Sequence, residues 1–146
     1  MVPSELTEFL QPYPERMRTL HLATRDLVLS EAPDCTEVIA DATNAVSCGY
    51  TFTHTHVKGF CFVASTLKNV ILGFPYGADL ADPERRLLGE GSRVRHVKIK
   101  EFADLSDSYN LDLLRQAIDR AFRPEPPLEQ KLVYMHYKGL KKRPGS

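Results

Sequence analysis

The chain has 146 residues, of which 42% are hydrophobic, so it is long enough to bury one core and too short to indicate two domains. Its 19 lysine and arginine residues balance 19 aspartate and glutamate residues, which argues against general binding to nucleic acids and other polyanions. No apolar run approaches the ~20 residues of a membrane helix, and the first residues lack the pattern of a secretory leader. We therefore expect a soluble, cytoplasmic protein.

Two helices are expected before residue 34. Ser4 is placed to cap a short helix that Pro12 ends. Pro14 is typical of the first position of a second helix, which the apolar spacing predicts from about residue 14 to residue 30. His21 lies on the apolar side of that helix and is expected to be a hydrogen-bonded residue at the border of the core.

Four strands follow in close succession. The runs TEVIAD, AVSCGYTF, FCFVA and NVILGF span residues 36–41, 45–52, 60–64 and 69–74. Short polar segments separate these runs, so neighbouring strands are expected to pair antiparallel. Because the runs are nearly all apolar, this part of the sheet should be well covered.

The segment that follows contains two turn signals. In FPYG, residues 74–77, the proline and the glycine stand where a type I turn prefers them. Asp82 followed by Pro83 is typical of a helix start, and Gly89 of a helix end, which predicts a short helix over 83–88.

The C-terminal part is expected to hold one strand, one helix and an extended end. RVRHVKIK predicts a strand over 93–100, and apolar spacing predicts a helix over 105–123. Prolines then mark an extended spacer, after which LVYMHY is a candidate edge strand and KGLKKRPGS a basic tail. We expect one domain over 1–146, with its core at about 14–122 and the spacer, edge strand and tail at 123–146.

The order of these elements indicates the fold class. Helices first, then a run of strands, then a helix is typical of an α+β protein rather than of repeated βαβ units. The expected architecture is a single antiparallel β-sheet packed against N-terminal and C-terminal helices. The sequence contains neither a dinucleotide-binding nor a phosphate-loop glycine motif, either of which would indicate a different fold.

The stretch over 69–99 resembles the signature of the YdhG-like domain of unknown function family. In NVILGF and GADLADPERRLLGEGSRVRHVKI, an aromatic-ended strand leads through a Gly-x-x-Leu-x-Asp-Pro step to a glycine-containing turn and an Arg-His strand. The resemblance covers about residues 14–122 and implies a compact α+β fold related in shape to frataxin. The matching residues are Gly77, Leu80, Asp82, Pro83, Leu88, Gly89, Gly91, Arg95 and His96.

Some relatives in that family have been proposed as iron chaperones. Such a role needs exposed carboxylates, because a hard cation prefers oxygen ligands. Here the acidic residues Asp79, Asp82 and Glu84 are dispersed and are soon followed by Arg85 and Arg86. That departure weighs against an iron role for this chain.

The main candidate site surrounds Arg95. In an extended strand Arg95, Val97 and Ile99 share a side, so Arg95 should lie half-buried at the edge of the core. Its guanidinium then needs Asp79 or Asp82, several carbonyls, or a bound carboxylate or phosphate. An internal partner and a ligand pocket are therefore the two alternatives.

The pocket alternative adds the glycine-containing turn after residue 88. Backbone amides in that turn would form an anion-binding nest beside the guanidinium. The candidate ligand-binding residues are Arg95, Arg93, Tyr76, Gly89, Gly91 and Asp82.

A second candidate is a metal site. The segment THTH places His54 and His56 on one side of an extended chain, and Cys48 or Cys61 is a possible third ligand. Two histidines in a loop are more often unliganded. The three cysteines, which include Cys35, are few and odd in number, which favours reduced thiols over a disulfide framework.

Several functions follow as expectations. The leading one is a non-enzymatic binding module without a cofactor, whose pocket near Arg95 takes a small anionic molecule or a protein partner. The alternative is a metal-handling protein, either a frataxin-like iron chaperone or a zinc or iron site at His54 and His56. An enzyme without a recognised motif is third. An exposed sheet edge would also permit a homodimer.

Overall fold

The structure is a computed structural model that describes residues 2–42, 44–55 and 58–136. These residues form three α-helices and one six-stranded sheet, which confirms the predicted α+β class. The helices are α1 (Ser4–Leu10), α2 (Glu15–Glu31) and α3 (Ser108–Asp119), with 3₁₀ turns η1 (Gly77–Asp79) and η2 (Phe102–Leu105). The strands are β1 (Thr36–Asp41), β2 (Val46–Thr51), β3 (Cys61–Ser65), β4 (Val70–Phe74), β5 (Arg95–Ile99) and β6 (Leu132–His136).

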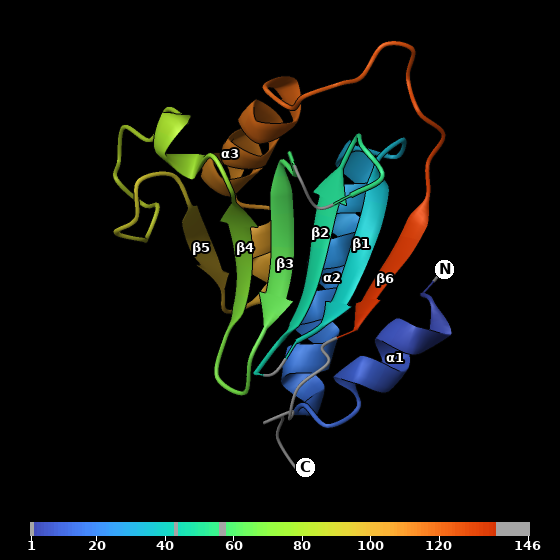
Figure 1. Ribbon diagram of the computed structural model, residues 1–146. Helices are drawn as coiled ribbons and strands as arrows, with labels where there is room; N and C mark the ends of the chain where they lie inside the picture. The colour runs from blue at the N-terminus through green and yellow to red at the C-terminus, as the bar shows by residue number, and fades with distance from the viewer. Residues whose placement is uncertain (1, 43, 56–57, 137–146) are drawn as a thin grey trace.

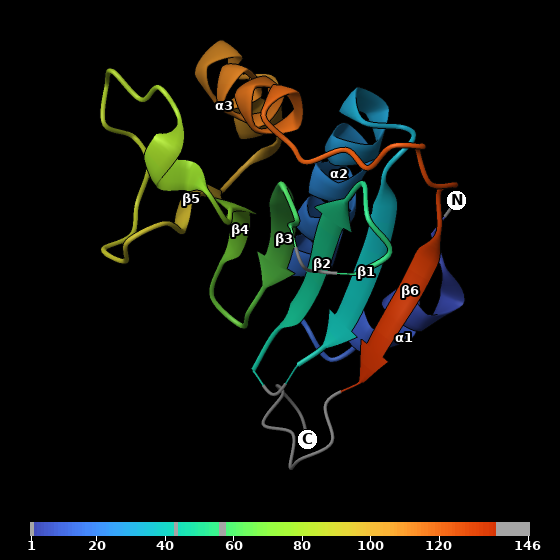
Figure 2. The ribbon, with the colours of Figure 1, turned by 45° about the horizontal axis from the view of Figure 1, so that its top comes forward.

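The strands lie side by side in the order β5-β4-β3-β2-β1-β6. From β1 to β5 each strand pairs antiparallel with its neighbour in sequence, as predicted. β6 is the predicted edge strand, but it pairs with β1 in parallel, so the sheet is mixed. A parallel neighbour needs a long connection, and the chain after α3 runs along one end of the sheet to reach the β6 edge (Figures 1 and 2).

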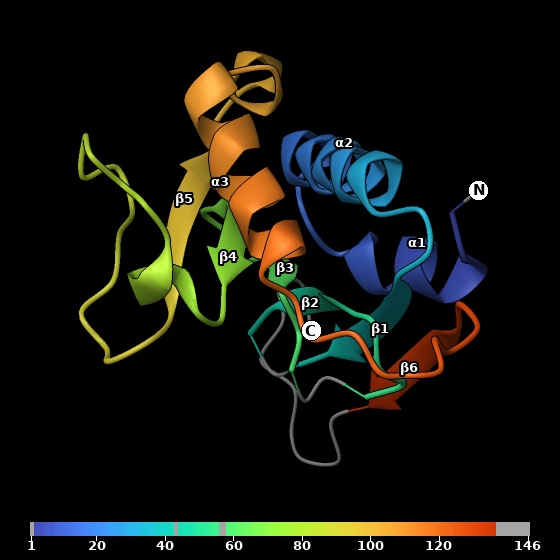
Figure 3. The same ribbon diagram turned by 90° about the horizontal axis from the view of Figure 1, so that it is seen from above.

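The helices lie on one face of the sheet. Figure 3 shows α2 and α3 over the strands, with α1 next to α2 near β1 and β6. In Figure 1 these helices lie behind the sheet. The burial of β5 follows this layering, because Val97 and Ile99 are buried whereas Lys98, which points to the other face, is exposed. The predicted side of Arg95, shared with Val97 and Ile99, is therefore the helix side.

The hydrophobic core fills the space between the sheet and the helices. It includes α1, so it begins before residue 14. None of the helices in the described residues is long and apolar enough to span a membrane. The largest side chains with almost no solvent exposure are Tyr13, Tyr50, Phe74, Leu6, Leu10, Ile39, Leu72, Leu113, Leu114, His21, Val28 and Val46.

The predicted helix over 83–88 is wrong. The carbonyl of Asp82 accepts from the amide of Arg85, which has a φ of 53°, and the chain turns without starting a helix. The Asp82 carboxylate then accepts from the amides of Arg86 and Leu87, at 2.9 and 3.0 Å. A segment this short cannot hold a helix by itself, so the side-chain hydrogen bonds decide its conformation.

Candidate functional site

Arg95 lies half-buried at the edge of the core, as its position in the strand predicts. Its Nη1 donates to the carbonyl oxygens of Gly91 and Val94, at 2.5 and 2.7 Å. Backbone carbonyls of the preceding loop, which are among the internal partners expected for Arg95, therefore hold one nitrogen of the guanidinium. Neither Asp79 nor Asp82 forms an ion pair with Arg95 among the described residues.

Two of the signature glycines make room for Arg95. A Cβ atom on Gly77 would lie 2.5 Å from the Cβ of Arg95, and a Cβ on Gly89 would lie 2.9 Å from the carbonyl oxygen of Val94. Gly89 also has a φ of +128°, which side chains disfavour. Gly91 differs, because a Cβ there would meet nothing within 4 Å.

Asp82 joins the loop after β4 to helix α3. Its Oδ1 accepts from the hydroxyl of Tyr109, and the same hydroxyl oxygen accepts from the amide of Glu84 at 2.9 Å. Burial opposes ionisation of Asp82, but the hydrogen bonds from Tyr109, Leu87 and Arg86 outweigh it and lower the pKa of the carboxyl group. The carboxylate is thus held ionised in a fixed position.

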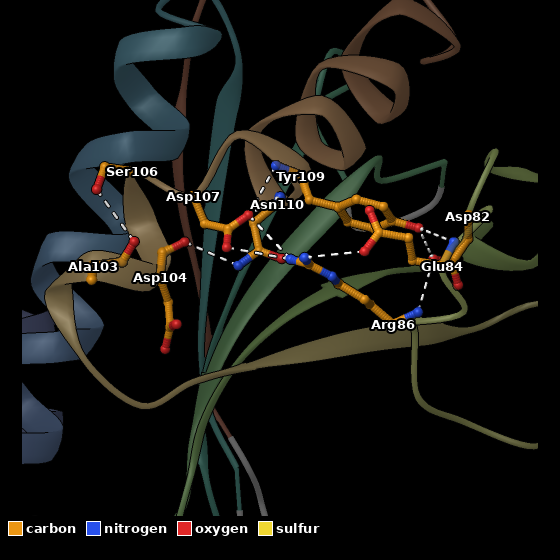
Figure 4. A network of polar contacts seen from close by, with 9 residues as sticks. All are labelled: Asp82, Glu84, Arg86, Ala103, Asp104, Ser106, Asp107, Tyr109 and Asn110. Atoms are coloured by element: carbon orange, nitrogen blue, oxygen red, sulfur yellow. Dashed lines mark hydrogen bonds and ion pairs between the residues drawn. The ribbon is translucent and has the colours of Figure 1, made fainter.

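Arg86 makes the second connection between this loop and α3. Figure 4 shows its guanidinium between Asp107 and Glu84, with nitrogen to oxygen distances of 3.2 and 3.3 Å. The same group lies over the ring of Tyr109, 4.3 Å from the ring centre. Asp107 also caps α3, since its carboxylate accepts from the amides of Tyr109 and Asn110.

Gln116, further along α3 than Tyr109, makes the third connection between this loop and the helix. Its side-chain amide donates to the carbonyl oxygen of Ala81 at 3.0 Å and accepts from the amide of Ala81 at 2.7 Å. Residues 81–87 are thus fixed on α3 by Gln116, Tyr109 and Asp107, and we call this segment the clasp. It holds the chain between β4 and β5 in one position relative to the helix.

A pocket of 390 Å³ lies beside the clasp, between the end of β4, the start of β3 and the end of α3. We call it the α3 pocket. Its size falls within the usual range for small-molecule sites. Most of its wall is aromatic or aliphatic. The lining residues are Lys58, Gly59, Phe60, Phe74, Tyr76, Asp79, Leu80, Ala117, Arg120, Ala121 and Phe122.

The charged residues of the α3 pocket carry more positive than negative charge. Lys58 and Arg120 supply two cations, and Asp79 supplies one carboxylate. The ammonium of Lys58 lies over the ring of Phe122, 4.0 Å from its centre. Within the described residues, none of the three charged side chains forms an ion pair. These charges are therefore available to a ligand.

The residues predicted around Arg95 are divided between the loop and the pocket. Tyr76 lines the α3 pocket and is 42% exposed. Arg93 lies just outside the lining, with its guanidinium 5.8 Å from the centre of the Tyr76 ring. Arg95, Asp82 and the two glycines at 89 and 91 are not in the lining and shape the neighbouring loop instead.

The predicted metal ligands give no cluster in the described residues. Nε2 of His54 is 2.7 Å from the carbonyl oxygen of Glu129, and His56 lies outside the described residues. Cys48 and Cys61 are buried in the sheet, and burial raises the pKa of each thiol. No group of three or more histidine, cysteine, aspartate or glutamate side chains gathers around a possible metal position in the described part of the chain.

A buried ion pair lies between α2 and β1, where sequence reasoning assigned no site. Nε and Nη2 of Arg25 donate to the two carboxylate oxygens of Glu37, at 2.7 and 2.9 Å. The Tyr50 hydroxyl donates to the same carboxylate at 2.8 Å. Both charged side chains are about 5% exposed. The signal in the sequence was a glutamate within an apolar strand, TEVIAD.

His21 lies deeper than the border position expected for it. Its side chain is fully buried, with Nδ1 2.6 Å from Oγ of Ser65 and Nε2 3.4 Å from Sγ of Cys48. Burial, together with the charge of Arg25, lowers the pKa of His21 to about 3. The neutral imidazole is therefore a structural link between α2 and the sheet.

Only part of the α3 pocket had a signal in the sequence. Ala121 and Phe122 lie within the helix predicted over 105–123 from its apolar spacing, and Tyr76 was a candidate ligand-binding residue. Nothing in the sequence marked Arg120, or the segment that contains Lys58, as neighbours of these residues. Comparison of the chain with known proteins adds no further marker, because no family model, curated protein or solved structure matches it.

Proposed function

We propose that the protein is a non-enzymatic binding module that takes a small, largely apolar molecule into the α3 pocket. The observation that carries this proposal is the pocket itself, with 390 Å³ of space and an aromatic and aliphatic wall. Residues at its mouth are large apolar groups in contact with solvent, since Tyr76 is 42% and Phe122 46% exposed. A ligand there would remove this surface from water.

The clasp supports the same proposal. It fixes the segment that includes Leu80, so that wall of the pocket is in place before a ligand arrives. A preformed site loses less conformational entropy on binding than one that must be ordered first. The residues that resemble the YdhG-like signature would then have a structural role and shape the loop beside the pocket. Membership of that family remains a proposal.

The test is a titration with 2-naphthoate, a bicyclic aromatic acid, in which NMR monitors the chemical shifts of the backbone amides. We expect the shifts to change at the pocket lining, and Ala121→Leu to weaken binding because the larger side chain fills the space. Ala103→Leu, at an exposed position outside the lining, is the matched control. Equal affinity in both variants, or shift changes elsewhere, would contradict the proposal.

A metal-handling function is the other expectation from sequence. No specific observation favours it, because His54 bonds a backbone carbonyl and the described residues gather no metal-ligand cluster.

A further inference from the structure

We propose that the ligand of the α3 pocket is an aromatic molecule with one anionic group, held by Arg120 and Lys58. This inference rests on the proposed function and adds the chemical class of the ligand. Its basis in the structure is that cationic side chains outnumber carboxylates around an apolar pocket.

The apolar part of the ligand is set by the pocket wall. Phe60 and Phe74 are buried, and Tyr76 and Phe122 are partly exposed at the mouth. Aromatic rings pack well against a flat aromatic body, in offset or edge-to-face arrangements. Ala117 contributes little bulk on the α3 side, which leaves space for such a body.

The anionic group is set by the two lining cations. Arg120 is exposed at the end of α3 and forms no hydrogen bond or ion pair through its side chain within the described residues. Lys58 is exposed and contacts the Phe122 ring rather than a carboxylate. A guanidinium binds a carboxylate through two parallel hydrogen bonds, and an ammonium adds a point charge.

The remaining charges favour an anion over a cation. Arg93 adds a third positive charge next to the Tyr76 ring, at the rim. Asp79 is the single carboxylate of the lining and opposes an anion. A cationic ligand would be attracted by one carboxylate and repelled by three positive side chains, whereas an anionic ligand would be attracted by three positive side chains and repelled by one carboxylate. The aromatic wall alone would also suit a cation, so charge is the deciding property.

The experiment compares three ligands of the same shape by isothermal titration calorimetry. They are 2-naphthoate, the neutral 2-naphthamide and the cationic 2-naphthylmethylammonium. We expect 2-naphthoate to bind about tenfold more tightly than the amide, as a charge-assisted hydrogen bond gives, and the cation to bind most weakly. Arg120→Gln and Lys58→Gln should each remove most of that preference while leaving the affinity for 2-naphthamide unchanged.

Two further variants sharpen the result. Asp79→Asn removes the opposing carboxylate and should tighten the binding of 2-naphthoate. Arg115→Gln is the control for Arg120→Gln, because Arg115 also lies on α3 but pairs with Glu31 outside the pocket.

The outcomes separate the two proposals. If 2-naphthamide binds as tightly as 2-naphthoate, or if Arg120→Gln leaves the preference intact, the anionic ligand class is overturned and the binding module stands. If the cation binds best and Asp79→Asn weakens it, the class is also overturned. If none of the three ligands binds at the pocket, the proposed function fails and this inference fails with it.

Discussion

The hydroxyl of Tyr109 in α3 donates a hydrogen bond to the carboxylate of Asp82, 27 residues earlier in the chain. This contact decides how the loop after β4 is folded, because the carboxylate it orients also accepts from two loop amides. The same hydroxyl oxygen accepts a hydrogen bond from the amide of Glu84. One side chain of the helix therefore fixes both sides of a turn in the clasp.

Tyr109→Phe should loosen the clasp. The variant keeps the ring beneath Arg86 but removes the hydroxyl that accepts from the Glu84 amide and donates to Oδ1 of Asp82. Oδ1 then keeps only its hydrogen bond from the Arg86 amide. We expect faster hydrogen exchange at the amides of Arg86 and Leu87, and weaker binding of 2-naphthoate, because the pocket wall next to the clasp becomes mobile. Amides in the pairing of β2 with β3 should exchange as in the unmodified protein.

Tyr76→Phe is the control for that change. It removes a hydroxyl from the same loop, but this hydroxyl bonds no other described residue. Unchanged exchange in the clasp is expected for the control. If Tyr109→Phe behaves like the control, the hydroxyl does not hold the clasp.

Glu37→Gln should destabilise the protein by about 3 kcal/mol, because it leaves the buried guanidinium of Arg25 without its buried charge partner. The remaining carboxylate near Arg25, that of Asp26, is 4.0 Å away and exposed. Urea unfolding at pH 7 measures the loss. Glu31→Gln breaks the exposed pair with Arg115 and should cost less than about 1 kcal/mol. Similar losses in the two variants would show that burial does not govern the contribution of the Arg25 pair.

The stability of the protein should fall as the pH drops below 6.5, in part through His21. The folded state holds the pKa of His21 at about 3, whereas in the unfolded chain it is near 6.5. Between these values the unfolded state binds the extra proton, so unfolding becomes more favourable as the pH falls. The contribution of neutral His21 to the free energy of unfolding is complete above pH 6.5. It is lost progressively down to pH 3, by about 1.4 kcal/mol per pH unit.

His21→Gln provides the test of this pH dependence. The variant lacks the titrating imidazole, so its free energy of unfolding should change less between pH 6.5 and pH 4.5 than that of the unmodified protein. Carboxylate titration is common to both and cancels in the comparison. Parallel pH profiles would contradict the assignment to His21.

Gly77→Ala should destabilise the protein by about 2 kcal/mol, since the added methyl group would lie 2.5 Å from the Cβ of Arg95. Gly91→Ala is the matched control in the same loop, where a methyl group meets nothing within 4 Å. It should change the stability by no more than about 0.5 kcal/mol. Thermal unfolding of both variants distinguishes a packing constraint from a general preference for glycine in this loop.

The sequence determined those helices and strands in which apolar residues recur at the spacing typical of the element. Alternation placed Arg95, Val97 and Ile99 on the helix side of β5, and apolar spacing placed α2 and α3 within a few residues of their ends. Asp107, a residue type that commonly caps helices, is the observed N-cap of α3. These features depend on neighbours within a few positions, so local patterns are sufficient to predict them.

Tertiary structure decided every feature that depends on distant segments. Asp82 followed by Pro83 is typical of a helix start, but Asp82 accepts from the hydroxyl of Tyr109 and begins a turn instead. The parallel pairing of β6 with β1 depends on a connection that crosses the end of the sheet. Lys58, Tyr76 and Arg120 meet at the α3 pocket from three parts of the chain, because packing the helix on the sheet brings those surfaces together. Periodicity shows which face of an element is apolar, but it does not show which other face will cover it.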